Sequence, residues 1–294
     1  MNLGLVCITH DETVRFRTLT RTRYLKLSPV EQRQTLRDLY TGNLKSFDKA
    51  LDFCVREDIR LYRVTSALFP FSDEPLGRDV LLEMSDQLAL IGKWAERLHL
   101  RIVVHPDQYV VLSSDSPEVI ANSIKVMQRH ALAFDLMRLP QNPWAAMILH
   151  GGKSDRAARL IDTIGRLPDN IRRRLVLEND EYAYKAQQIY EVCVAAKVPM
   201  VFDAHHHLVA EKLCDYEHPS VSHFTELAAT TWPCRDWQLV HLSNGASGMC
   251  DPAHHDLITH WPSAFDHVPW VEIEAKHKDR AIKLLRAKLS RPGR

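Results

Sequence analysis

The sequence predicts a single α/β domain, a closed (β/α)8 barrel that spans residues 1–294. Apolar runs rich in Val, Ile and Leu recur eight times, each about as long as a buried strand, and segments with helical spacing separate most of them. This alternation predicts a parallel sheet. Because no repeat, low-complexity run or Gly/Ser linker marks a boundary, eight units predict closure into one barrel. A doubly wound open sheet is the alternative.

Each expected strand is an apolar run that polar or turn residues bound on both sides. In chain order the expected strands are Leu3–Ile8, Ile59–Ser66, Arg101–Pro106, Ala145–Gly152, Arg173–Asp180, Pro199–His206, Trp237–Gly245 and Trp270–His277.

The clearest expected helix is Pro29–Phe53. Ser28 is suited to its N-cap, Pro29 to its first position, and Glu31 completes a capping box. The other segments with helical spacing are Asp79–Leu98, Pro117–Met137, Lys185–Ala196 and Lys278–Leu289.

The composition indicates an ordinary globular protein, with 45% hydrophobic and 26% charged residues and a net charge of +1. The six cysteines include no C-x-x-C pair, no secretory signal opens the chain, and no apolar run reaches the roughly 18 residues of a membrane span. We therefore expect a reduced, cytoplasmic protein without a disulfide framework or a membrane partner.

One local exception to the balanced charge is the segment Arg15–Lys26, "RFRTLTRTRYLK", which we call the basic arm. It contains no acid, and Phe16 and Tyr24 are interleaved among its cations. It is either a solvated loop or a segment that contacts phosphates. Its five cations are Arg15, Arg17, Arg21, Arg23 and Lys26.

Six successive strands end in imidazoles or carboxylates, and in a barrel these ends converge on one face. A lone buried His or Glu is usually a hydrogen-bonded core residue, but several buried carboxylates cost several kcal/mol each unless a cation neutralises them. Because most of these strand ends carry no basic residue, metal ions are the expected cations. The side chains are His105, His150, Glu178–Asp180, Asp203, His205–His207, His241, Glu272 and Glu274.

Imidazole and carboxylate without thiolate suit Mn²⁺, Zn²⁺ or Fe²⁺. The candidates exceed what one ion can use, so we expect two or three ions, and ions about 3.5–4 Å apart are typical of phosphoryl-ester hydrolases. A metal-dependent sugar isomerase or epimerase on the same barrel is the competing hypothesis.

The stretch "HPDQYVVL" places a second candidate feature at the mouth of this site. Pro106 ends the strand, so that Gln108 and Tyr109 lie on the following loop. They are either an ordinary loop pair or a wedge that fills the gap left when nucleotides leave the duplex stack.

The motifs "LYRVTSALFPF", "HPDQYV", "ILHGGKSD", "LENDE", "FDAHHHL", "VHLSNG", "AHHD" and "EIEAKHK" occur in order along nearly the whole chain. Together they closely resemble the UV damage endonucleases. The resemblance implies a TIM barrel with a divalent metal cluster, commonly manganese. It also implies a repair enzyme that nicks UV-damaged double-stranded DNA immediately 5′ to the photoproduct, leaving a 3′-hydroxyl and a 5′-phosphate. We expect this enzyme to be a monomer. An abasic-site enzyme of the endonuclease IV class is the nearest alternative.

The resemblance also implies roles for individual residues. Gln108 and Tyr109 become the lesion-probing pair, and Glu178 the bridging carboxylate that acts in catalysis with His241 and Glu274. The implied metal ligands are His105, His150, Glu178, Asp203, His206, His241, His254 and Glu274.

Three positions depart from the family pattern. Where relatives often carry a His after "PF", this chain has "FSDEP", so either Asp73 or Glu74 replaces that ligand or the ligand is missing. Leu5 and Thr9 stand where Tyr and Asn often lie near the lesion; Thr9 is kept as a candidate DNA contact. Leu239 replaces a Lys two residues before His241.

Two hypotheses follow from the strand period. Glu272 shares a face with Glu274, so it either supplies the polar function lost at Leu239 or pairs with a nearby cation. In "FDAHHHL", Asp203 and His206 can both be ligands only if the strand ends near Ala204 and the chain turns into a loop. We then expect His205 and His207 to be neighbours of the site rather than ligands.

Overall fold

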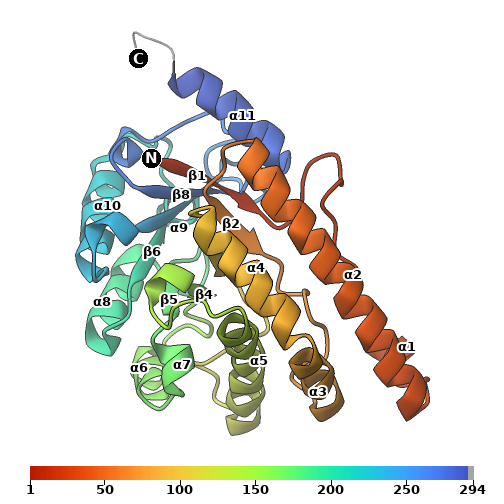
Figure 1. The fold of residues 1–294 in the computed structure, drawn as a ribbon. Coiled ribbons are helices and arrows are strands. Elements are labelled where there is room, and N and C mark those ends of the chain that lie inside the picture. Colours follow the sequence, from red (N-terminus) through yellow and green to blue (C-terminus); the bar gives the residue numbers. More distant parts are fainter. Residues whose placement is uncertain (291–294) are drawn as a thin grey trace.

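Eight parallel strands close a barrel in chain order in the computed structural model, which describes residues 1–290 (Figure 1). The predicted fold class is confirmed, and each observed strand is shorter than its apolar run. The strands are β1 (Asn2–Val6), β2 (Leu61–Val64), β3 (Arg101–Val104), β4 (Met147–His150), β5 (Leu175–Glu178), β6 (Met200–Asp203), β7 (Leu239–Leu242) and β8 (Trp270–Ile273).

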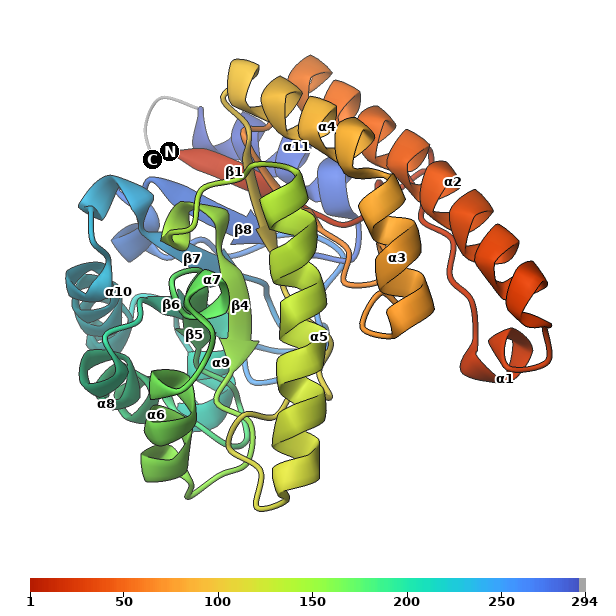
Figure 2. The ribbon, with the colours of Figure 1, turned by 60° about the horizontal axis from the view of Figure 1, so that its bottom comes forward.

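The helices pack around the barrel, and the long α2 with the short α1 at its start projects beyond it (Figure 2). They are α1 (Arg21–Tyr24), α2 (Pro29–Arg56), α3 (Pro75–Glu83), α4 (Ser85–Arg97), α5 (Pro117–Leu136), α6 (Ala157–Gly165), α7 (Asp169–Arg172), α8 (Ala186–Ala196), α9 (Ala204–Glu211), α10 (Pro219–Thr231) and α11 (Lys278–Leu289).

The start of α2 forms as its sequence predicts. The Ser28 hydroxyl accepts a hydrogen bond from the Glu31 amide at 3.4 Å, and the Glu31 carboxylate accepts one from the Ser28 amide at 2.8 Å. Both bonds satisfy donors that a helix start leaves unpaired. The helix ends at Arg56, three residues beyond the expected end at Phe53.

Two predicted segments differ from the structure. The helix expected over Asp79–Leu98 is two helices, α3 and α4, because Met84 has φ −91° and ψ 6° and interrupts the helical backbone. The loop expected after Asp203 is the helix α9. The Asp203 carboxylate caps it by accepting a hydrogen bond from the His206 amide at 2.7 Å, which stabilises a helix directly after β6.

The apolar core has two parts, one between the barrel and the helices and one inside the barrel. Leu239 lies in the interior part, one strand period before His241. Leu5 lies in the outer part, so the expectation that it stands near the site is wrong. On β1 the interior position belongs to Gly4, where the Leu61 side chain of β2 fills the space that a Cβ atom would need.

Candidate metal centre

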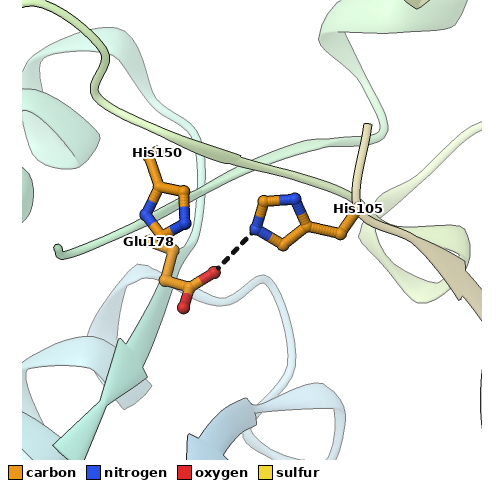
Figure 3. Close-up of side chains that lie close together, drawn as sticks. All are labelled: His105, His150 and Glu178. Atoms are coloured by element: carbon orange, nitrogen blue, oxygen red, sulfur yellow. Dashed lines mark hydrogen bonds and ion pairs between the residues drawn. The ribbon is translucent and has the colours of Figure 1, made fainter. Parts of the chain in front are cut away.

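Three of the predicted strand-end side chains meet at the carboxyl ends of β3, β4 and β5 (Figure 3). His150 and Glu178 are register partners on adjacent strands, and His105 directly follows β3. The Nε2 atom of His105 lies 3.1 Å from Oε2 of Glu178, and the two imidazole ring centres are 5.0 Å apart. One ligand atom from each residue lies within 4.8 Å of the others, which forms a first candidate ligand group.

Glu178 is the centre of the site, and its carboxylate is 1% exposed. Besides His105, it faces Nδ1 of His241 at 3.0 Å and Nδ1 of His206 at 3.4 Å. Burial alone would raise the pKa of Glu178, but His241 and the other imidazoles outweigh it and hold this pKa well below its usual range. Glu178 is therefore an ionised carboxylate that several histidines share.

Glu178 also belongs to a second candidate group, with Asp203 and His206. The α9 helix that Asp203 caps turns the His206 ring back toward Glu178, where its Nδ1 lies 3.0 Å from the Asn179 carbonyl. Burial lowers the pKa of His206, but Asp203 and Glu178 raise it well above its ordinary value.

A third group combines His241 and Glu272, which are register partners on β7 and β8, with Glu274. The Nε2 atom of His241 lies 3.3 Å from Glu272, and its Nδ1 lies 3.5 Å from Glu274. Burial lowers the pKa of His241, but Glu178 and Glu272 raise it to about 10. The hypothesis that Glu272 pairs with a nearby cation is the one that the geometry bears out, because Arg63 lies 2.6 Å from it.

Arg63 is the residue of this site that sequence reasoning missed. It lies on β2, and its Nη1 atom contacts Glu274 at 2.5 Å as well as Glu272. The two-residue period of β2 was the available signal, because Leu61 points into the barrel and Arg63 follows it by two residues.

Each of the three groups contains buried polar atoms that a divalent ion could satisfy. The Nδ1 atom of His150, Oδ2 of Asp203 and both ring nitrogens of His241 are buried without a hydrogen-bond partner among residues 1–290. Within the same residues, no lysine or arginine forms an ion pair with Glu178 or Asp203. Buried polar atoms that converge without donors are costly unless a cation binds them.

The three consecutive histidines point in different directions. His206 faces Glu178, whereas His205 uses both ring nitrogens elsewhere, 2.6 Å from the Ser243 hydroxyl and 3.0 Å from the Asp251 carbonyl. The Nε2 atom of His207 lies 2.8 Å from Ser220. Of the triplet, His206 is the residue available to the centre.

His254 lies at the rim of the centre, outside the three ligand groups. Its ring centre is 6.5 Å from that of His206, and its Nδ1 lies 2.7 Å from the Glu274 carbonyl. Its predicted role as a ligand stays a prediction.

Asp73 and Glu74 are not brought to the centre. Asp73 pairs with Arg129 at 3.2 Å, and Glu74, the N-cap residue of α3, pairs with Arg21 at 2.6 Å. Thr9 is 1% exposed, and its hydroxyl accepts a hydrogen bond from the Val14 amide, which removes it from the surface that DNA could contact.

Gln108 and Tyr109 are exposed on the loop after β3, with 62% of Tyr109 accessible. The loop is nevertheless anchored, because Asp107 accepts hydrogen bonds from the Tyr109 hydroxyl at 2.7 Å and from Arg129 on α5 at 2.5 Å. A cavity of about 930 Å³ lies beside Tyr109, between α5 and the basic arm.

The basic arm presents its cations to solvent and buries its aromatic residues. Tyr24 stacks on Phe71 with ring centres 4.4 Å apart, and Phe16 packs against the core. Arg15 and Arg21 form ion pairs with Glu12 and Glu74, whereas no ion pair within residues 1–290 involves the arm's other three cations, Arg17, Arg23 and Lys26. The aromatic residues therefore anchor the arm.

None of the helices within residues 1–290 combines the length and apolarity needed to cross a membrane.

Comparison with known proteins places these features in a family. The family described as "UV-endonuclease UvdE" matches residues 1–292. A UV DNA damage endonuclease of Nostoc sp. is 53% identical over 287 residues, which cover 97% of this chain and 89% of that protein. One from Deinococcus radiodurans is 47% identical, with coverages of 97% and 94%.

Two solved structures show the same fold. The crystal structure of SacUVDE superposes with a TM-score of 0.84 at 24% identity, covering 99% of this chain and all of the other (100%). Endonuclease IV from Thermus thermophilus gives a TM-score of 0.61 at 12% identity, with coverages of 98% and 99%.

Proposed function

The chain belongs to the UV-endonuclease family UvdE and is an endonuclease that acts on DNA, and from that premise we propose how it acts. It nicks the damaged strand of UV-irradiated duplex DNA immediately 5′ to the photoproduct, at a centre of two or three divalent metal ions, most simply Mn²⁺. One chain suffices, because all three ligand groups come from the same barrel.

The observation that carries this proposal is the shared carboxylate of Glu178. It belongs both to the group with His105 and His150 and to the group with Asp203 and His206. One carboxylate shared between two ligand groups is the arrangement expected of a bridging ligand. Ions held there would activate a water molecule and stabilise the charge on the phosphate and the leaving oxygen.

Residues of the chain itself would position the reacting groups. His241 and Glu274 line the same bowl, where Nδ1 of His241 faces both Glu178 and Glu274, and the two residues are proposed to hold the attacking water in place. Water attacks phosphorus, the bond between phosphorus and the 3′-oxygen breaks, and that oxygen takes up a proton. The products therefore carry a 3′-hydroxyl and a 5′-phosphate, and no side-chain nucleophile is required.

Lesion recognition is proposed to depend on the exposed pair Gln108 and Tyr109. Extruding a nucleotide costs a few kcal/mol, and less where damage has already weakened pairing. An amide and an aromatic ring on an anchored loop can replace the lost stacking without reading base edges. The basic arm then contacts phosphates of damaged and undamaged DNA alike.

One cleavage assay tests the proposal. The protein is incubated with Mn²⁺ and three matched duplexes that carry one pyrimidine dimer, one abasic site or no damage. We expect a single nick immediately 5′ to the dimer, with ends that a DNA ligase can rejoin after photoreversal. Glu178→Gln protein and a chelator serve as negative controls.

Two other outcomes of this assay would support the alternative activities. Cleavage of the abasic duplex alone would support the endonuclease IV type of activity. Absence of cleavage from all three duplexes, with metal bound, would contradict the proposal and return the sugar isomerase hypothesis to first place.

A further inference from the structure

The segment that follows α9 and the loop that follows β7 meet at the carboxyl end of the barrel, and each brings a cysteine to the contact. Cys214 follows the end of α9 and is exposed, whereas Cys250 lies in the loop after β7 and is partly buried. The thiol of Cys250 donates a hydrogen bond of 3.0 Å to the carbonyl of Leu213, the residue directly before Cys214. The two thiols also lie within hydrogen-bonding reach of each other.

The two segments are fixed to each other on both sides of Cys214. Before it, the Leu213 carbonyl accepts the bond from Cys250, and the Leu213 amide donates a bond of 2.9 Å to the last turns of α9. After it, Tyr216 is 2% exposed, and its hydroxyl donates a hydrogen bond of 2.7 Å to the Ser243 carbonyl at the end of β7. Backbone contacts therefore keep the two cysteines together.

The loop that carries Cys250 is closed tightly on itself. The Asp251 carboxylate accepts hydrogen bonds of 2.9 Å from the amides of Ser247 and Ala253. A Cβ atom at Gly245 would lie 1.9 Å from the Gly248 carbonyl oxygen, so the turn leaves no room for a side chain there. A loop that makes so many internal contacts holds Cys250 in one place beside the end of α9.

The two thiols differ in exposure, and this difference gives them different reactivity. Cys214 is exposed, so a peroxide in solution can reach it. Burial raises the pKa of Cys250, and the neighbouring Cys214 adds to the rise, so Cys250 remains a neutral thiol. Elsewhere in the chain, Cys54 and Cys193 are buried in the core, where no oxidant reaches them. An exposed thiol beside a second thiol is the arrangement of a redox-sensitive pair.

We propose that Cys214 and Cys250 form a reversible disulfide when the protein meets hydrogen peroxide. The Cys214 sulfur attacks the peroxide: an S–O bond forms, the O–O bond breaks, and the departing hydroxide takes up the proton that the thiol released. The Cys250 sulfur then attacks the Cys214 sulfur, so that an S–S bond forms and the S–O bond breaks. The departing oxygen takes up the Cys250 proton. Two thiols are oxidised by two electrons, and one peroxide is reduced to two waters.

The disulfide would brace α9 against the loop after β7. These two segments already touch at the start of the helix, where Nε2 of His205 lies 3.0 Å from the Asp251 carbonyl. The new bond would join them at the other end of α9, and a cross-link restricts the unfolded chain more than the folded one. Because α9 carries His206 and the loop carries His254, the brace would stabilise one wall of the centre. The proposal does not depend on which metal or which lesion the centre binds.

Thiol counting and peptide mapping test the proposal. Reduced protein is treated with hydrogen peroxide, the remaining thiols are alkylated, and tryptic peptides are analysed by mass spectrometry. We expect the free thiols to fall from six to four per chain and one peptide pair to join Cys214 to Cys250. Dithiothreitol should reverse both changes. In Cys214→Ser the joined peptides should be absent.

Cys234→Ser is the matched control. Cys234 lies on the same tryptic peptide as Cys214 and is also only partly buried, but it precedes β7, whereas Cys250 follows that strand. This variant should still form the disulfide. Joined peptides that disappear in Cys234→Ser and persist in Cys214→Ser would overturn the assignment, and so would a disulfide that joins Cys214 of two chains.

Thermal unfolding tests the brace separately from the bond. The oxidised wild type should melt several degrees above the reduced protein, and peroxide should leave the melting temperature of Cys214→Ser unchanged. Because Cys214 is exposed, its replacement by Ser is expected to leave the fold intact, which circular dichroism verifies. A disulfide that forms without raising the melting temperature would contradict the brace, and a wild type that keeps all its thiols in peroxide would contradict the whole proposal.

Discussion

Two arginines with little solvent exposure occupy opposite ends of the same barrel, and their surroundings differ in kind. Arg63 near the carboxyl end of β2 is held by the carboxylates of Glu272 and Glu274. Arg101, at the amino end of the neighbouring β3, is 0% exposed, and its hydrogen bonds go to backbone carbonyls.

The direct contacts of the Arg101 guanidinium are with neutral groups, and Glu272 acts on it only at longer range. It donates hydrogen bonds of 2.9 to 3.0 Å to the carbonyls of Pro143, Trp144 and Trp237. Its charged carbon lies 4.9 Å from the ring centre of Trp144 and 5.4 Å from those of Trp232 and Trp270. Indole faces and carbonyl dipoles thus replace a counter-ion.

The pKa of each group reflects this difference. Burial lowers the pKa of Arg101 to about 9, so it is still charged at neutral pH. Burial also lowers the pKa of Arg63, but Glu272 and Glu274 outweigh it and raise that pKa above its ordinary value. At the amino end of the barrel, Arg101 packs within the core. At the carboxyl end, where (β/α)8 barrels carry their active sites, Arg63 pairs with two carboxylates.

Removing the shared carboxylate should give the largest effect and sharpen this contrast. Glu178→Gln keeps the shape of the side chain but removes the charge that both ligand groups use. We expect nicking of dimer-containing DNA to fall by on the order of 10³-fold, because loss of a direct ligand should exceed the 10- to 100-fold effects of supporting residues. Nicking rates and bound metal measure it.

The unfolding free energy of metal-free Glu178→Gln should fall at neutral pH, because a carboxyl whose pKa is held below its usual range stabilises the folded state and the variant leaves His206 and His241 without that counter-charge. Urea unfolding of the metal-free protein measures it, and an unchanged or raised free energy would contradict the charge pairing between Glu178 and its histidines.

Removing Arg101, at the opposite end of the barrel, should lower stability and leave the function of the folded protein intact. Arg101→Met leaves three carbonyls without their donor, and at about 1 kcal/mol each we expect a loss of about 3 kcal/mol in the free energy of unfolding. Urea unfolding measures it. Metal content and the nicking rate of the folded fraction should stay at wild-type values.

Arg97→Gln, at an exposed arginine near the end of α4, is the control and should change stability by no more than about 0.5 kcal/mol. A fall in metal content for folded Arg101→Met would show that the two ends of the barrel are coupled.

The sequence predicted the histidines and the carboxylate that meet at the functional end of the barrel, but not the arginine that lies among them. The strand period and the barrel rule were enough to bring His105, His150, Glu178 and His241 to one face, because those positions follow directly from where each strand ends. They did not show Arg63 against Glu272, because that contact joins β2 to β8 across β1, between strands that are not neighbours in the sheet.

Local structure at the strand ends was harder to predict for a related reason. Asp203 caps α9 and is also a candidate ligand, and the pattern "FDAHHHL" fits either a loop or a helix start. The burial of Thr9 and the outward position of Leu5 likewise depend on tertiary packing. Periodicity places residues on a face, but only the packed structure decides their partners.

A smaller effect is expected at the rim of the functional end. Tyr109→Ala should lower the preference for dimer-containing over undamaged duplex about tenfold, since stacking a base on an aromatic ring contributes about 1–3 kcal/mol. Binding titrations of the two duplexes measure it, and bound metal should not change. Tyr109→Phe keeps the ring and loses only the hydrogen bond to Asp107, so it should retain the preference. Equal losses in both variants would assign the role to the loop anchor instead of the ring.

The smallest effect is expected from the basic arm, and it tests whether the functional end extends beyond the barrel. Arg23 is exposed, and within residues 1–290 no ion pair engages it, so it is free to meet a phosphate. Arg23→Gln should weaken binding to damaged and undamaged duplexes by the same few-fold factor. It should also reduce the slope of log affinity against log salt by about 1, as expected for one lost phosphate contact. Binding measured between low and physiological salt gives the slope.

Arg97→Gln removes the same charge from α4, just before β3 begins, and should leave the slope unchanged. If both variants flatten the slope equally, DNA responds to the overall charge of the protein and the arm is no more than a solvated loop.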